Sequence, residues 1–142
     1  MRGEDNMPGA TSIPEDRVLT VQECELVRWL LEHGNENAKS FLVHLESAKV
    51  ISRCYCGCAS INFAVANKVP TAASFQVLSD FQWESPEGHL FGVFVFARND
   101  LLSGLEVWSI DGQSTPTSLP AIENLKPLGS EVCIQDDGPN KP

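Results

Sequence analysis

The stretch "KVISRCYCGCASINFAVAN", residues 49–67, decides the fold because the spacing of apolar residues changes there. In its second half, Ile61, Phe63 and Val65 alternate with other residues, which is typical of a strand with one buried face. Gly57 lies between the two halves, and glycine readily adopts the positive φ that a tight turn requires. The stretch therefore predicts two strands joined by a turn at "CGCA".

Two helices are predicted before this stretch. In "TVQECELVRWLLEHG", residues 20–34, Thr20 and Glu23 match a capping box, and Gly34 ends a run of apolar residues at helical spacing. In "NENAKSFLVHLESA", residues 35–48, apolar residues recur at i, i+3, i+4 and i+7 along one face. The short connection predicts that the two helices pack as antiparallel neighbours.

Three further strands are predicted after the stretch, at residues 74–83, 90–100 and 105–111. The second of these is apolar at most positions, which indicates a central strand covered on both faces. From Asp111 onward, five prolines in 32 residues leave little room for regular structure. The predicted fold is α+β: two N-terminal antiparallel helices packed on an antiparallel sheet of about five strands, followed by an irregular proline-rich C-terminal segment.

A single domain is expected to account for most of the chain. Its 142 residues are enough for one ordinary hydrophobic core and too few for two. The prolines, glycines and polar residues at 1–18 predict a flexible leader, and residues 129–142 are predicted to be a flexible tail. The α+β domain is therefore expected at residues 19–128.

The charge of the chain excludes some classes of partner. Ten lysines and arginines against nineteen aspartates and glutamates give a net charge of −9, so a basic surface for nucleic acid or an anionic membrane is not expected. An acidic chain favours a basic protein partner, with the chain itself a monomer or a homodimer. No apolar run approaches the roughly 20 residues of a membrane span, and the first residues lack a secretory signal. We therefore expect a cytoplasmic protein with reduced cysteines.

The candidate site is the cluster of Cys54, Cys56 and Cys58. Residues two apart on a strand share a face, and a turn at Gly57 can bring the third cysteine back toward the first two. Three thiolates and one further ligand make a tetrahedral zinc site. The candidates for the fourth ligand are His44, which is close in the sequence, His89 and Cys133.

Two other interpretations of the cluster stay open at this point. A thiol redox site is one, because Arg53 lies beside Cys54 and can lower the pKa of that thiol. A bridge from Cys54 to Cys58 is more plausible than a strained bridge from Cys54 to Cys56. Packing is the other interpretation, in which the cysteines and Gly57 are small residues that let a tight hairpin pack closely.

The pattern V-I-x-R-C-x-C-G-C-x-S-I-x-F, followed by L-x-x-L-E-V-W-S-I-D-G, resembles a family of small bacterial proteins with a C-x-C-G-C-x-S hairpin motif. The resemblance covers roughly residues 20–128, and its most specific part runs from Arg53 to Ser60. It implies a single-domain bacterial cytosolic protein of uncharacterised function, and it implies no activity or cofactor.

No catalytic motif accompanies the cluster, since the sequence lacks G-x-S-x-G, a phosphate-binding glycine loop and H-E-x-x-H. Trp83 and Trp108 are candidate interface residues, because exposed tryptophans often anchor protein contacts. The sequence therefore favours a non-catalytic protein-interaction or regulatory module without a cofactor. The alternatives are a zinc-binding module built on the three cysteines and a thiol redox protein.

Overall fold

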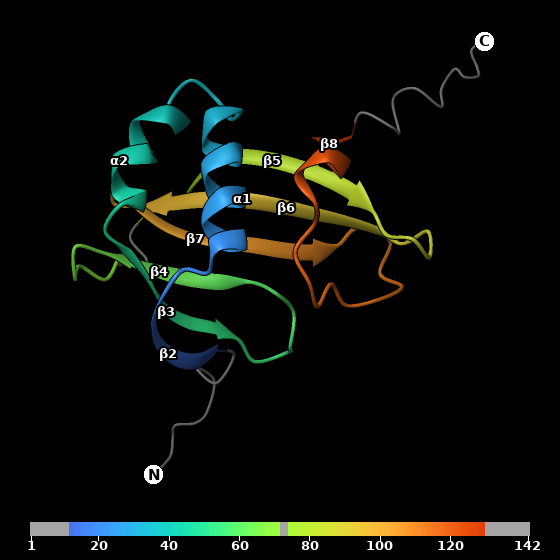
Figure 1. The fold of residues 1–142 in the computed structure, drawn as a ribbon, viewed down its shortest axis with the longest axis horizontal. Coiled ribbons are helices and arrows are strands. Elements are labelled where there is room, and N and C mark those ends of the chain that lie inside the picture. Colours follow the sequence, from blue (N-terminus) through green and yellow to red (C-terminus); the bar gives the residue numbers. More distant parts are fainter. Residues whose placement is uncertain (1–11, 72–73, 130–142) are drawn as a thin grey trace.

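The computed structural model describes residues 12–71 and 74–129. Within these residues the chain forms one antiparallel sheet of seven strands, in the order β2-β3-β4-β7-β6-β5-β8 (Figure 1). The strands are β2 (Ser12–Val18), β3 (Ala48–Cys54), β4 (Ile61–Val65), β5 (Gln76–Glu84), β6 (Leu90–Arg98), β7 (Leu101–Ser109) and β8 (Lys126–Pro127). The helices are α1 (Val21–Glu32) and α2 (Leu42–Leu45), with two 3₁₀ turns, η1 (Ala38–Phe41) and η2 (Ile122–Asn124).

The first helix, α1, begins where the sequence predicts and lies across one face of the sheet (Figure 1). Its capping box is present, because Glu23 N donates to the Thr20 hydroxyl at 3.0 Å and Thr20 N donates to the Glu23 carboxylate at 2.9 Å. The buried side chains of Leu26 and Leu30 belong to the core that α1 shares with the sheet. The local pattern of the sequence therefore predicts this helix correctly.

The hairpin predicted at residues 49–67 is confirmed. Strands β3 and β4 pair antiparallel, with Val50 opposite Phe63, and both side chains are buried in the core. The β6–β7 hairpin differs from the prediction, because Asn99 and Asp100 adopt positive φ and turn the chain within two residues. Strand β7 therefore begins at Leu101, four residues before its predicted start.

The fold class predicted from the sequence is wrong. Strands account for 42% of the described residues and helices for 20%, so the protein is mostly sheet rather than two helices on five strands. The second predicted helix, at residues 35–48, is reduced to η1 and the single turn of α2. Asn35 ties its start to β5 through two hydrogen bonds, to the carbonyls of Val77 and Leu78, and β3 begins at Ala48. Between these two points the chain forms one 3₁₀ turn followed by one α-helical turn.

Part of the predicted leader is a strand of the sheet. β2 pairs with β3, with Ser12 opposite Cys54, and Pro14 is accommodated because β2 is an edge strand. The Arg17 guanidinium donates to both oxygens of the Glu23 carboxylate, at 2.9 and 3.0 Å, and so fastens β2 to α1. The first 11 residues lie outside the described residues.

The C-terminal segment returns to the sheet. β8 pairs with β5 at the opposite edge from β2, with Pro127 opposite Phe81. Three apolar residues of this segment pack against the core, whereas Leu128 is 42% exposed. The docked residues are Leu119, Ile122 and Leu125. The predicted tail lies outside the described residues from position 130 onward.

Candidate metal centre

The cysteine cluster occupies the turn between β3 and β4. Cys54 is the last residue of β3, and its N–H donates to the carbonyl of Ser60 at 3.2 Å, which closes the turn. Gly57 has a φ of +93°, as the sequence predicts, and a Cβ at this position would meet nothing within 4 Å. Gly57 is therefore required for its backbone conformation, not for close packing of the hairpin.

The three sulfur atoms converge at this turn. Cys54 Sγ lies 2.9 Å from Cys56 Sγ, and all three Sγ atoms of the cluster lie within 4.8 Å of one another. In a tetrahedral zinc site with Zn–S bonds of about 2.3 Å, sulfurs are about 3.8 Å apart. The three cysteines thus lie close enough to bind a metal ion, after small side-chain rotations at Cys54 and Cys56.

Two thiols of the cluster have pKa values that are shifted in opposite directions. Burial, the hydrogen bond with Cys56 and the nearby Cys58 sulfur raise the pKa of Cys54 to about 12. The pKa of Cys56 is lowered, because Cys54 Sγ–H and the Cys58 N–H donate to its sulfur, the latter at 3.4 Å. Cys56 is also the exposed member of the cluster. Of these two thiols, the one that loses its proton more easily is therefore also the more accessible one.

Arg53 does not activate Cys54, although the sequence suggested that it could. Its Nε donates to the Glu15 carboxylate at 2.8 Å, which places the guanidinium in an ion pair between β3 and β2. The thiol with the lowered pKa is Cys56, not Cys54, and the cause is hydrogen bonding within the turn. No sequence signal predicts this lowered pKa, because it depends on the direction of each S–H and N–H bond.

Neither histidine proposed as a fourth ligand lies with the cysteines. His44 belongs to α2, where its Nδ1 accepts a hydrogen bond from Leu102 N at 3.2 Å. The seven-residue strand β3, about 20 Å long, separates α2 from the cysteine turn (Figure 1). His89 lies in the β5–β6 loop, with Nδ1 3.9 Å from the Asp111 carboxylate. Cys133 lies outside the described residues.

Ser60 is a contact of the cluster that sequence reasoning missed. Its hydroxyl lies 3.3 Å from Cys58 Sγ, accepts from Val107 N at 2.9 Å and lies 3.2 Å from the Val107 carbonyl. Ala59 N also donates to the carbonyl of Pro116, at 3.0 Å. These bonds hold the end of the turn against β7 and the C-terminal loop. The available sequence signal for this contact was the C-x-S pattern, in which Ser60 follows Cys58 by two positions.

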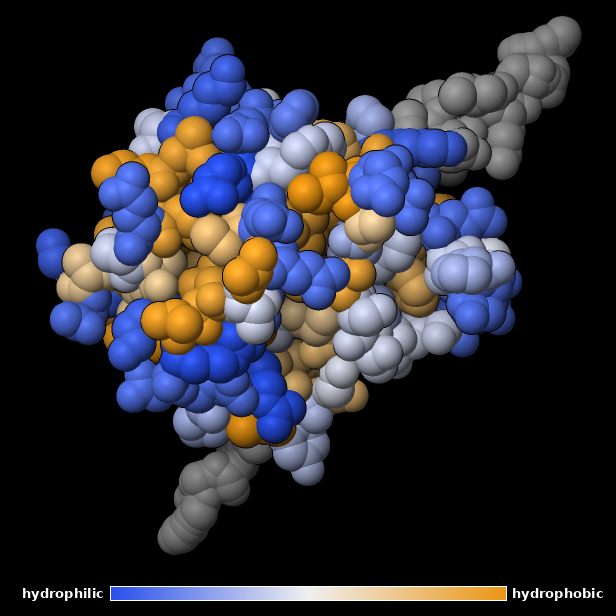
Figure 2. Space-filling model, in the orientation of Figure 1, coloured by the Kyte–Doolittle hydropathy of each residue, from blue (hydrophilic) through white to orange (hydrophobic). Residues whose placement is uncertain are grey.

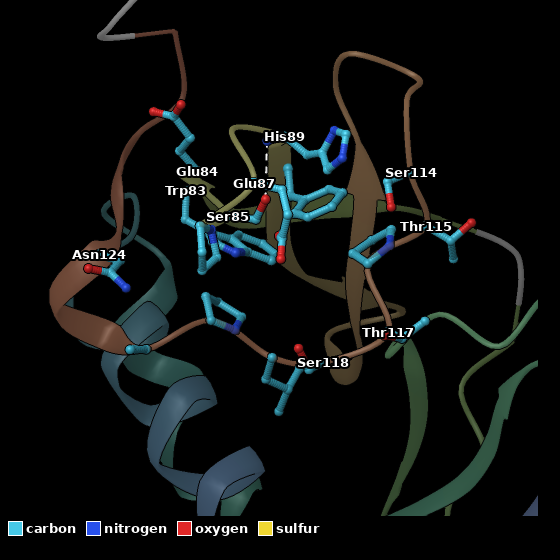
Figure 3. Close-up of a pocket in the computed structure, with 16 residues that line it drawn as sticks. Trp83, Glu84, Ser85, Glu87, His89, Ser114, Thr115, Thr117, Ser118 and Asn124 are labelled. Carbon is cyan, nitrogen blue, oxygen red and sulfur yellow. Dashed lines mark hydrogen bonds between the residues drawn. The ribbon is translucent and has the colours of Figure 1, made fainter.

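A cavity of about 390 Å³ lies between the β5–β6 loop and residues 114–121. Figure 3 shows Glu87 and His89 of the β5–β6 loop facing the hydroxyl-bearing C-terminal loop across it. Trp83 lines this cavity and is only 8% exposed, so it belongs to the core rather than to a free interface. Among the described residues, the cysteine cluster is the group of side chains with metal-site spacing.

Comparison with known proteins finds no match to a protein-family model, to a curated protein or to a solved structure. The resemblance to bacterial proteins with a Cys-Gly-Cys hairpin therefore stays a prediction. In the part of the chain that the structure describes, no helix has the length and apolar character needed to cross a membrane.

The pKa values of the cluster predict the order in which its thiols react. In metal-free protein at neutral pH, we expect iodoacetamide to modify Cys56 first and Cys54 last, because the thiolate is the reacting species. The rate at Cys56 should rise with pH and reach its plateau well before that of Cys54. Peptide mass spectrometry over a time course measures both rates. Equal rates at the two positions would show that the hydrogen bonds of the turn do not form as described.

Proposed function

We propose that this protein binds a zinc ion through the thiolates of Cys54, Cys56 and Cys58. The observation that carries the proposal is the convergence of three sulfurs within 4.8 Å on a single short turn. Thiolate ligands favour zinc and Cu(I) over hard cations such as Mg²⁺ and Ca²⁺. With three protein ligands, the fourth position of a tetrahedral ion is open to water or to another ligand.

Packing explains the cluster less well than metal binding does. Cys56 is exposed, so its sulfur contributes little to the core, and Gly57 beside it has free space around it. Cys58 does pack against the core, as a partly buried residue. Packing therefore accounts for one cysteine of the three, whereas a metal ion accounts for all of them.

A redox function also leaves part of the arrangement unexplained. A disulfide uses two sulfurs, and the close approach of Cys54 and Cys56 leaves the Cys58 sulfur beside them without a role. The raised pKa of Cys54 disfavours a second thiolate next to the first, and a bound dication removes that penalty by neutralising both charges. The site needs reduced thiols, so a cytoplasmic location is part of the proposal.

Metal titration tests the proposal. We expect metal-free protein to bind one zinc ion per chain, with three thiols protected from a thiol reagent and Cys24 unaffected. Cu(I) is titrated in parallel against a competing chelator, because it also prefers thiolates. Zinc binding that protects no thiol would overturn the proposal. Thiol protection by Cu(I) alone would overturn the choice of zinc and leave a thiolate metal site.

A further inference from the structure

The described helices lie on one face of the sheet (Figure 1). The other face of β5, β6 and β7 carries side chains that do not belong to the core beneath the helices. On the helix side, apolar surface appears as separate patches between hydrophilic residues (Figure 2). On the other face, which we call the second face, directly opposed residues of the antiparallel strands form rows. The rows are Gln82–Gly92–Trp108, Asp80–Phe94–Glu106 and Val77–Phe96–Gly104.

An aromatic cluster occupies one end of the second face. The ring centroid of Phe75 lies 5.0 Å from that of Phe96 and 6.2 Å from that of Phe94, and Phe75 is 51% exposed. The guanidinium of Arg98 lies over the Phe75 and Phe96 rings, at 5.0 and 5.5 Å from their centroids. The second face therefore already holds one cation by cation–π contact, supplied by the chain itself.

Trp108 supplies a further aromatic surface on the same face. A Cβ on Gly92 would lie 2.4 Å from Trp108 Nε1 and 2.7 Å from Cε2, so the indole packs directly on the glycine backbone. Trp108 is nevertheless 38% exposed. Its ring is thus held in a fixed position across β6 while one surface stays open to a ligand.

Two carboxyl groups flank Phe94, one from each neighbouring strand. Asp80 and Glu106 are half-buried, and burial raises the pKa of both, with the Ser60 hydroxyl offsetting part of the rise at Glu106. The buried Asp80 Oδ1 has no hydrogen-bond partner among the described residues. The ion pairs found in those residues involve neither carboxyl group. Burying a carboxylate without a cation is costly, so a positively charged ligand placed between these two groups would be favoured.

We propose that the second face binds a basic protein segment, which places an arginine or lysine against Phe94 between the carboxylates of Asp80 and Glu106. Neighbouring strands are about 4.8 Å apart, so a cation over Phe94 has a carboxylate on each side. Trp108 offers an adjacent surface for the aliphatic stem or for cation–π contact. The net charge of −9 would steer a basic partner toward the protein.

The charge argues against two other occupants. A second copy of the chain would bring two acidic faces together, and like charges in contact disfavour association. The segment at 130–142 carries Glu131, Asp136 and Asp137 against Lys141, so its net charge has the same sign as the face. An external basic partner is the occupant that complements the surface.

An arginine-containing peptide tests the proposal on the full chain. The ligand is an acetylated, amidated peptide of alternating arginine and valine, compared with the same peptide carrying citrulline, which keeps the shape but removes the charge. We expect the arginine peptide to shift the NMR signal of the Trp108 indole N–H, and the citrulline peptide to bind at least about tenfold more weakly.

Matched variants separate a built site from general attraction. The double variant Asp80→Asn with Glu106→Gln should lose at least about tenfold in affinity, a difference of about 1.4 kcal/mol. Glu46→Gln with Glu123→Gln removes the same charge from exposed positions elsewhere and should change affinity less than about twofold. Equal losses in both variants, or an unshifted Trp108 signal, would overturn the proposal. Contacts from residues 130–142 or from a second copy to Trp108 would overturn it as well.

Discussion

Replacing Cys56 with serine is expected to lower the zinc affinity of the protein by at least about 100-fold, since even the loss of an outer-shell partner costs 10- to 100-fold. Cys56 is the thiol with the lowered pKa, so it supplies the thiolate that forms most readily. Its removal leaves the sulfurs of Cys54 and Cys58 as the two remaining thiolate ligands of the turn. Competition with a chromophoric zinc chelator measures the change.

The Cys56→Ser substitution is also expected to leave the fold intact. Its side chain is exposed, so the metal-free Cys56→Ser protein should unfold within about 0.5 kcal/mol of the metal-free parent. Cys24→Ser in α1 is the matched control, because it removes a half-buried thiol far along the chain from the cluster and should keep zinc affinity unchanged. Zinc affinity that survives Cys56→Ser would contradict the three-thiolate site.

Replacing Gly92 with alanine is expected to destabilise the protein by about 1–3 kcal/mol, the usual cost of overpacking. The added Cβ would lie 2.4 Å from Trp108 Nε1, so the indole has to leave its position over β6. Denaturation in urea measures the loss of stability. The affinity for the arginine peptide should fall together with it, because Trp108 no longer has its fixed orientation.

A double-mutant cycle isolates the clash at Gly92 from other effects of the added methyl group. In a Trp108→Ala background the ring is gone, so Gly92→Ala should cost less than about 0.5 kcal/mol. The coupling energy between the two positions should therefore account for most of the destabilisation. A cost that is equal in both backgrounds would show that the close contact between Trp108 and Gly92 is not formed.

Local signals in the sequence predicted the parts of the fold that local physics determines. The capping box at Thr20 specifies the start of α1, and Gly57 specifies the turn that gathers the cysteines. The second helix was predicted from an apolar spacing that the sequence does contain. The prediction was wrong because the ends of this segment are fixed by the bonding of Asn35 to β5 and by the start of β3. That constraint comes from a strand more than 40 positions away in the sequence.

The contacts across strands could not be predicted in the same way. Strand β2 was not predicted because a proline such as Pro14 indicates a loop, unless the strand is known to lie at the edge of a sheet. The row of Asp80, Phe94 and Glu106 depends on the register of three strands, which a one-residue slip would undo. The cysteine cluster was accessible to sequence reasoning because its three members lie within five positions of one turn.

X-ray absorption at the zinc edge of the zinc-loaded protein tests the three-thiolate site most directly. The site described here predicts three sulfur atoms at about 2.3 Å and one oxygen or nitrogen atom at about 2.0 Å. The spectrum of the Cys56→Ser protein, loaded at a higher zinc concentration, should show one sulfur fewer. A zinc shell of oxygen and nitrogen atoms without sulfur would contradict the proposal that Cys54, Cys56 and Cys58 bind the metal.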